Sequence, residues 1–222
     1  MYSVRPNLLM RRIYPSAVWR VPSKEKKIFL TFDDGPVPEV TPWVLSALRD
    51  YNAKATFFCV GATIEKHPDI FRQIIAEEHS IGNHTYNHLN GWKTKKEDYL
   101  KNIEKCNAQI SRYADGQMKT HPHIFSFAHP NILFRPPYGR MTKSQISILK
   151  SQYSVVMWDV LSGDFDKKTS EEQCLQNVLT KAREGSIVVF HDSVKAKKNL
   201  YYVLPKFLKH FSEKGFVFKK LR

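Results

Sequence analysis

Short apolar runs alternate with amphipathic segments along most of the chain. The runs are typical of buried strands, and segments with apolar positions every three or four residues are typical of helices. The runs predict seven strands, at residues 27–32, 54–60, 79–84, 131–134, 153–158, 186–190 and 216–220. The amphipathic segments predict six helices, at residues 41–51, 67–78, 94–113, 142–152, 170–184 and 199–214. This alternation indicates an α/β fold with a largely parallel sheet.

Local signals mark the ends of several predicted elements. Thr41 is the expected N-cap of the first helix. Ser170 and Gln173 have the spacing of a capping box at the start of the fifth helix. Pro205 is expected to break or bend the last helix. Residues 114–131, rich in Pro and His, are predicted to form a loop insertion.

Seven strands and six helices fit an α/β barrel better than an open sheet, although periodicity alone does not exclude the open sheet. The 222 residues lie within the range of a single domain, and the 42% apolar and 13% aromatic content excludes a disordered chain. In either parallel arrangement, reactive side chains are expected at the carboxyl ends of the strands.

The net charge of +14 indicates attraction to polyanions. The basic residues are scattered, however, and no nucleic-acid-binding motif accompanies them. Specific nucleic-acid binding is therefore not predicted. Weak attraction to an anionic wall or membrane surface is kept as an interpretation, although solvated surface charge is the favoured one.

The sequence gives few signals of location. The apolar run at residues 8–10 is stopped by Arg11 and Arg12, short of the ~7 residues of a signal-peptide core. No run approaches the ~18 apolar residues of a membrane span. The location is unknown, with the cytoplasm as the default expectation. The three cysteines, Cys59, Cys106 and Cys174, are too far apart in sequence to indicate a disulfide framework or a zinc site.

Residues with unusual chemistry follow five of the apolar runs. A barrel would gather them on one rim. They are Asp33 and Asp34, His84 and His88, Arg135, Asp164, and His191.

The segment HTYNH places His84 and His88 four residues apart, on the same side of a helical turn, a spacing that suits one metal ion. Surface histidine pairs with this spacing are common, so the pair alone is weak evidence for a metal site. One carboxylate from the Asp33–Asp34 pair would complete a three-ligand site with an open position for water. The second carboxylate could take a proton from that water as general base. Spacing does not say which aspartate has which role.

Two further strand-end groups fit acid–base chemistry. Arg135 can pair with a carboxylate and hold it ionised. His191 could act as a general acid opposite the base, with Asp164 raising its pKa. A surface arginine and an ordinary strand-end histidine are the alternatives.

The segments TFDDGP, HTYNH, FRPPYGR, GDFD and IVVFHD, in this order between residues 31 and 192, closely resemble the five motifs of the polysaccharide deacetylases, carbohydrate esterase family four. Any one motif is weak, but five in order are highly specific. The resemblance implies a single-domain, distorted (β/α) barrel of about seven strands. It assigns residues 27–222 to the catalytic domain and leaves residues 1–26 as an N-terminal segment packing on the barrel.

The resemblance also implies the activity. This is hydrolysis of N-acetyl groups on glycans that contain N-acetylglucosamine, either peptidoglycan or chitin-like. Asp34, His84 and His88 would bind a divalent metal, usually Zn²⁺, with Co²⁺, Ni²⁺ or Mn²⁺ as alternatives. Five other residues would have catalytic roles: Asp33 as base, Arg135 positioning Asp33, the Tyr138 N–H stabilising the oxyanion, His191 protonating the departing amine, and Asp164 tuning His191.

Two positions depart from the usual family pattern. Phe165 stands where the family usually has Trp, and Val189 where it often has Leu. These two residues, with Pro136 and Ile187, are expected to wall the acetyl pocket, so the changes should alter substrate fit more than activity. The family is usually exported, which conflicts with the missing signal peptide.

Other functions remain open at this point. They are a non-catalytic carbohydrate-binding relative, an O-acetyl esterase of the same fold, and a glycosidase with paired carboxylates that needs no metal. His121, His123 and His129 could form a second metal site, although a loop without one is the favoured interpretation.

Overall fold

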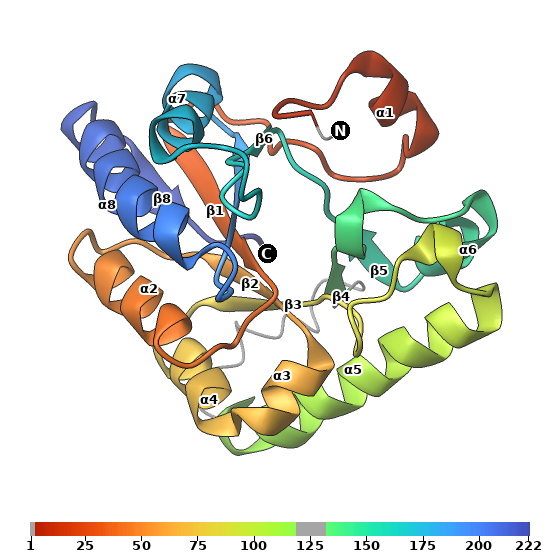
Figure 1. Ribbon diagram of the computed structural model, residues 1–222. Coiled ribbons are helices and arrows are strands. Elements are labelled where there is room, and N and C mark those ends of the chain that lie inside the picture. The colour runs from red at the N-terminus through yellow and green to blue at the C-terminus, as the bar shows by residue number, and fades with distance from the viewer. Residues whose placement is uncertain (1–2, 119–131) are drawn as a thin grey trace.

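The computed structural model describes residues 3–118 and 132–222. Seven strands pair in parallel in the order β5-β4-β3-β2-β1-β7-β6, and β8 pairs with the start of β1. The bounds of all eight strands are β1 (Lys27–Asp33), β2 (Thr56–Cys59), β3 (Ser80–Asn83), β4 (Ile132–Phe134), β5 (Tyr153–Val155), β6 (Val160–Leu161), β7 (Ile187–His191) and β8 (Val217–Lys219). The sheet curls into an open barrel with helices on its outer face (Figure 1). The predicted distorted (β/α) barrel is confirmed. The two-residue strand β6 was not predicted.

Eight α-helices lie in the described part of the chain. They are α1 (Leu8–Ile13), α2 (Val40–Arg49), α3 (Gly61–Lys66), α4 (Pro68–Ala76), α5 (Lys96–Met118), α6 (Lys143–Leu149), α7 (Glu171–Lys181) and α8 (Lys197–Glu213). Six of them correspond to the predicted helices. The two shortest, α1 and α3, were missed because six residues carry too few apolar repeats to show a period.

The helix ends differ from the sequence signals. Thr41 lies inside the first turn of α2 and does not cap it. Its hydroxyl instead accepts a hydrogen bond from the Val37 N–H and donates one to the Asp192 side chain. Ser170 does cap α7, but the Gln173 side chain donates to Asn177, so the capping box is one-sided. Helix α8 runs without a break through Pro205.

The predicted loop insertion at residues 114–131 is only partly described. Helix α5 continues to Met118, so residues 114–118 are helical instead of looped. The loop prediction rested on proline and histidine, and the first of these, His121, comes three residues after the helix end. His121, His123 and His129 lie outside the described residues.

Alternation along β1 separates the core from the barrel interior. Ile28, Leu30 and Phe32 are fully buried and pack in the largest core cluster, which includes residues of α2 and α8. Because successive side chains of a strand point to opposite faces, Thr31 and Asp33 face the interior of the barrel. The last inward position of β1 is therefore a carboxylate.

The segment before β1 is bonded to the sheet. The Val18 N–H donates to the Val155 carbonyl, and the Met157 N–H donates to the Val18 carbonyl, both at 2.8 Å. Arg5 and Arg11 each form an ion pair at 3.1 Å with Asp159, whose side chain is fully buried. These contacts hold the N-terminal segment against residues 155–159, at the end of β5 and in the connection to β6. The division of the chain at residue 26 stays a prediction.

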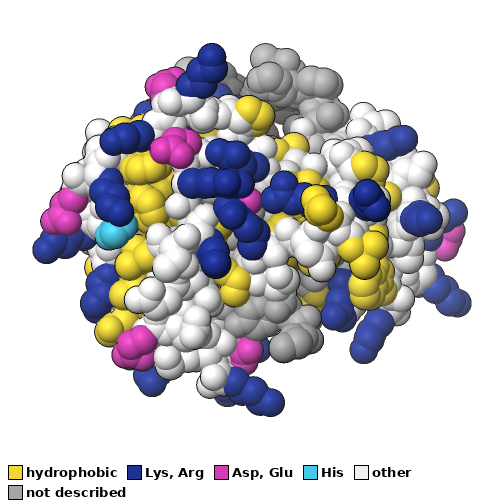
Figure 2. All heavy atoms as spheres, turned by 90° about the horizontal axis from the view of Figure 1, so that it is seen from above, with side chains coloured by type: hydrophobic (Ala, Val, Ile, Leu, Met, Phe, Trp, Pro, Cys, Tyr) yellow, Lys and Arg dark blue, Asp and Glu magenta, His cyan; other side chains and the backbone are white. Residues whose placement is uncertain are grey.

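The surface is strongly basic on the face seen in Figure 2. Lys and Arg side chains are spread over it, with few Asp or Glu side chains among them. In the described part of the chain, no helix is both long enough and apolar enough to cross a membrane.

Candidate active site

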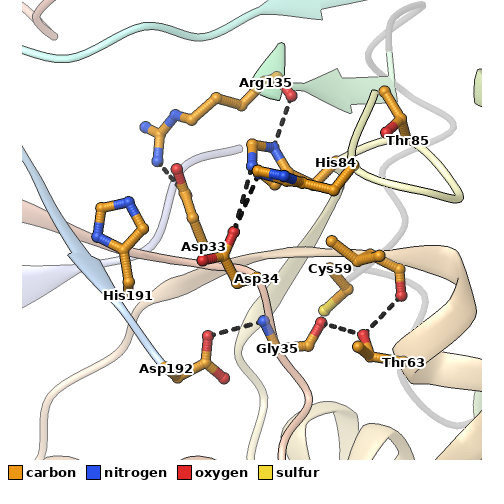
Figure 3. Close-up of polar contacts among 12 residues, drawn as sticks. Asp33, Asp34, Gly35, Cys59, Thr63, His84, Thr85, Arg135, His191 and Asp192 are labelled. Atoms are coloured by element: carbon orange, nitrogen blue, oxygen red, sulfur yellow. Dashed lines mark hydrogen bonds and ion pairs between the residues drawn. The ribbon is translucent and has the colours of Figure 1, made fainter. Parts of the chain in front are cut away.

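The carboxyl ends of the strands bring together the side chains predicted to react. Asp33 and His191, the last residues of β1 and β7, are neighbours in the parallel pairing. His84 follows β3 and Arg135 follows β4. These residues, with Asp34 and His88, line one cavity of about 440 Å³. Figure 3 shows how Asp33, Asp34, His84, Arg135 and His191 lie relative to one another.

Three ligand atoms converge at the base of this cavity. The Oδ1 atom of Asp34 lies 3.7 Å from Nε2 of His84 and 3.3 Å from Nε2 of His88. One ligand atom from each residue lies within 4.8 Å of the other two. Asp34 Oδ1 is buried and has no hydrogen-bond partner among the described residues. An unpartnered buried carboxylate oxygen facing two imidazole nitrogens is a fitting place for a cation.

The two imidazoles are held in the form that binds metals. His84 Nδ1 lies 2.7 Å from the Arg135 carbonyl oxygen, so Nδ1 carries the proton and the Nε2 lone pair faces Asp34. Burial is the main cause that lowers the pKa of His84, well below its ordinary value, and burial also lowers the pKa of His88. Both rings are therefore neutral near pH 7, as ligands must be.

The histidine pair does not lie on a helical turn, as its spacing had suggested. No helix covers residues 84–88, and Thr85 and His88 have positive φ values of 60° and 55°. The Asn83 side chain accepts a hydrogen bond from the Thr85 N–H, and the Thr85 hydroxyl accepts one from the Leu89 N–H. These side-chain bonds shape a loop that turns both rings towards Asp34.

Asp33 is paired with a buried arginine. Arg135 is 1% exposed, and its Nη1 donates to Asp33 Oδ1 at 2.6 Å. Three of its other four N–H groups donate to the Thr31 hydroxyl and to the Val156 and Met157 carbonyls. Burial lowers the pKa of Arg135, while the Asp33 carboxylate opposes that shift. These bonds hold the guanidinium on several sides, so it fixes the orientation of Asp33.

His191, which lines the cavity, is paired with the carboxylate of Asp164 behind it. Its Nδ1 lies 2.7 Å from Asp164 Oδ1, and its backbone N–H donates to Asp164 Oδ2 at 2.8 Å. Burial alone would lower the pKa of His191, but the charge and hydrogen bond of Asp164 outweigh it and raise the pKa to about 9. The ring is therefore protonated at neutral pH, with Nε2 as the remaining donor.

Comparison with known proteins agrees with this geometry. The family described as polysaccharide deacetylase matches residues 20–153, more than half of the chain. The chain belongs to the polysaccharide deacetylase family. A peptidoglycan-N-acetylglucosamine deacetylase of Bacillus cereus is 32% identical over 215 residues, which cover 95% of this chain and 94% of that protein. The predicted enzyme class, a hydrolase of amide bonds, is thereby confirmed.

Two further matches have names that give different substrates, a chitooligosaccharide in one and peptidoglycan in the other. A chitooligosaccharide deacetylase of Azorhizobium caulinodans is 32% identical, covering 78% of this chain and 77% of that protein. The crystal structure of a peptidoglycan N-acetylglucosamine deacetylase superposes with a TM-score of 0.81 at 30% identity, covering 97% of this chain and 94% of that one. Both matches extend over most of the barrel.

The pocket of this polysaccharide deacetylase is walled by apolar side chains. Pro136, Phe165 and Val189 line the cavity, as does Tyr138, whose φ of 59° turns the chain there. Ile187 does not line it. Ile187 is fully buried one layer deeper, packed with Phe58, Val156 and Leu221.

Sequence reasoning missed several residues in and around the deacetylase pocket. Trp158 and Leu161 line the cavity beside Phe165. Asp192, fully buried beside His191, accepts a hydrogen bond from the Gly35 N–H (Figure 3) and another from the Thr41 hydroxyl. The sequence carried a signal for Asp192, since it follows a predicted catalytic residue in IVVFHD. Trp158 also carried a signal, since it is the last residue of the predicted strand at residues 153–158. Leu161 carried none, because β6 was not predicted.

Proposed function

We propose that the protein is a metal-dependent deacetylase that removes acetyl groups from N-acetylglucosamine-containing glycans. The observation that carries this proposal is the convergence of Asp34, His84 and His88 beside a cavity that Asp33 and His191 also line. Two imidazoles and one carboxylate suit Zn²⁺, and Co²⁺, Ni²⁺ or Mn²⁺ accept the same donors. A bound metal would polarise the acetyl carbonyl and lower the pKa of a water molecule.

The residues of the chain divide the proton transfers between them. Asp33, held by Arg135, takes the proton of the attacking water as general base. His191, kept protonated by Asp164, donates its Nε2 proton to the amine nitrogen as the C–N bond breaks. The two residues lie on neighbouring strand ends, so they can act on the two sides of one acetyl group.

The loop after β4 offers a donor for the developing oxyanion. Pro136 and Pro137 have no N–H, so the first backbone donor after Arg135 is the N–H of Tyr138. A backbone donor aimed at the carbonyl oxygen stabilises the charge that forms there. Phe165, Val189 and Trp158 surround the acetyl methyl group with apolar surface and exclude water.

Acetate release tests this proposal directly. The purified protein is treated with a strong chelator, divided, and reloaded with zinc in one portion. We expect zinc-dependent acetate release from chitotetraose or from peptidoglycan fragments. Acetate release that is equally fast in the chelated portion would contradict the metal dependence. Release from acetylated xylan alone would indicate an O-acetyl esterase instead.

A further inference from the structure

Two basic side chains line the active-site cavity without a described carboxylate partner. Asp33 is paired with Arg135, and Asp34 belongs to the three-ligand cluster. These are the only acidic residues among those that line the cavity in the described chain. Arg140 and Lys195 line the same cavity, and no carboxylate of the described residues forms an ion pair with either. The residues that line the cavity therefore carry net positive charge.

Arg140 is held in place by an anchored aromatic ring. Its guanidinium carbon lies 5.0 Å from the centroid of the Trp92 ring. The indole Nε1 of Trp92 donates to the Met141 carbonyl at 2.8 Å, which fixes the ring although 55% of the residue is exposed. Stacking on a ring leaves the N–H edge of a guanidinium free for hydrogen bonds in its own plane. Arg140 is thus a pre-positioned cation with free donors.

Lys195 supplies the second charge from the other arm of the barrel. Arg140 follows β4 and Lys195 follows β7, and three strands (β3, β2 and β1) separate these two in the sheet. The Lys195 Nζ lies 5.7 Å from the centroid of the Phe165 ring. Its neighbours Lys197 and Lys198 each have a glutamate partner, Glu39 at 2.7 Å and Glu171 at 4.0 Å. Lys195 differs from both in facing the cavity.

We propose that the substrate carries a carboxylate next to its acetylated amino sugar, and that Arg140 binds this carboxylate while Lys195 adds the second positive charge. The inference rests on the proposed deacetylase function and names its substrate class, an acidic glycan. An arginine binds a carboxylate with two parallel hydrogen bonds, a geometry that lysine cannot reproduce. A neutral chitin chain offers no anion to these donors.

The carboxylate could belong to the lactyl ether of a muramic acid or to a uronic acid, and substrate arms separate these sources. Zinc-loaded enzyme is assayed on peptide-free oligomers of N-acetylglucosamine and N-acetylmuramic acid, on the same oligomers with their carboxylates reduced to alcohols, and on oligomers of N-acetylglucosamine and glucuronic acid. Chitotetraose is the neutral reference. We expect kcat/KM on one carboxylate substrate to exceed that on its reduced form by roughly tenfold or more, mainly through KM.

Variants test whether Arg140 and Lys195 cause this preference for the acidic substrate. Arg140→Met keeps the apolar stem, and we expect it to lower kcat/KM on the acidic oligomer far more than on chitotetraose, so that the preference is lost. Arg140→Lys keeps the charge without the paired donors and should recover only part of the preference. Lys195→Gln should weaken the preference and its salt dependence. Lys198→Gln, a nearby exposed lysine outside the cavity, should match wild type.

Several outcomes would overturn the inference. One is equal kcat/KM on the acidic and reduced oligomers, and another is a loss in Arg140→Met that is as large on chitotetraose as on the acidic oligomer. If Arg140→Met fails to fold, Arg140→Lys and Lys195→Gln decide the question in the same assay. Acetate release from chitotetraose with no acidic preference leaves the deacetylase function standing. No release from any substrate removes both proposals.

Discussion

The Asp192 carboxylate accepts a hydrogen bond from the Gly35 N–H at 3.1 Å, and this bond ties the end of β7 to the turn after Asp34. Asp34 has a φ of 86°, a conformation that a non-glycine residue keeps only when its surroundings enforce it. A Cβ atom at position 35 would lie 1.9 Å from Asp192 Oδ2, so only glycine allows this contact. Asp192 therefore positions Asp34, the proposed metal ligand, without touching it.

Removing the Asp192 carboxylate should loosen the metal site. In Asp192→Ala the Gly35 N–H and the Thr41 hydroxyl lose a buried acceptor, which costs about 1–3 kcal/mol of unfolding free energy for each. We expect zinc affinity to fall by about tenfold, as for partners that orient ligands. Zinc titration and thermal unfolding measure the two effects.

Asp192→Asn is the matched control for this change. Burial raises the pKa of Asp192 to about 8, so its surroundings disfavour a negative charge, and the uncharged amide of Asn is a close replacement. The Asn variant should keep most of the stability and zinc affinity. Wild-type zinc affinity in Asp192→Ala would show that the turn needs no such support.

Arg135 should be needed for stability as well as for catalysis. Arg135→Met leaves the Asp33 carboxylate buried without its partner, a change that costs about 3–5 kcal/mol of unfolding free energy. Losing the guanidinium also removes the group that orients Asp33, so kcat should fall by roughly 10²-fold. Urea unfolding and acetate release measure the two effects. Thr31→Val, which removes one acceptor of Arg135 but keeps the ion pair, should show a smaller loss of both stability and kcat. A wild-type kcat in Arg135→Met would show that Asp33 needs no positioning by Arg135.

The sequence predicted the strands well, and it also predicted which three residues would come together, Asp34, His84 and His88, because each prediction rests on a local pattern. Long apolar runs marked seven strands, and the residue after each run marked the strand end. The convergence of Asp34, His84 and His88 then follows from parallel pairing, since carboxyl ends meet on one rim.

Features that depend on tertiary contacts were not predictable. Thr41 looks like an N-cap, but its hydroxyl bonds to Asp192, which is 151 residues away in sequence. The two histidines converge through a loop shaped by Asn83 and Thr85 instead of a helical turn. Ile187 shares a strand face with Val189, yet depth along the barrel axis decides which of the two meets the cavity. The role proposed for Arg140 depends on its stacking on Trp92, a contact that the sequence does not reveal.

Two substitutions should separate metal binding from proton transfer. His84→Ala removes a ligand, and we expect its bound zinc to fall well below one ion per chain. Asp33→Asn keeps the three ligands, so zinc content should stay at the wild-type level while kcat falls by roughly 10²–10⁴-fold. Metal analysis and acetate release measure the two quantities. His210→Ala, which removes a histidine of α8 outside the cavity, should leave both unchanged. Normal turnover in Asp33→Asn would refute its assignment as base.

The His191–Asp164 pair should set the alkaline limit of activity. Asp164 raises the pKa of His191 to about 9, so the protonated acid persists through neutral pH and is lost as the pH rises through that value. Asp164→Asn removes the charge but keeps a hydrogen-bond acceptor, and the alkaline limb of kcat/KM should move down towards the ordinary histidine pKa of about 6.5. At pH 8 the variant should therefore lose most of its activity, whereas at pH 6 the loss should be smaller.

Stability should follow the same proton, with a sign fixed by linkage. Because the folded-state pKa of His191 is raised, folding gains stability from the charged pair below the unfolded-state pKa, and this gain fades between about pH 6.5 and the folded value of about 9. Wild type should thus lose unfolding free energy across that interval relative to Asp164→Asn. Urea unfolding at pH 6, 7.5 and 9 measures the difference. A difference that stays constant with pH would mean that Asp164 supports His191 through packing and hydrogen bonding alone, and the alkaline limb would then need another acid.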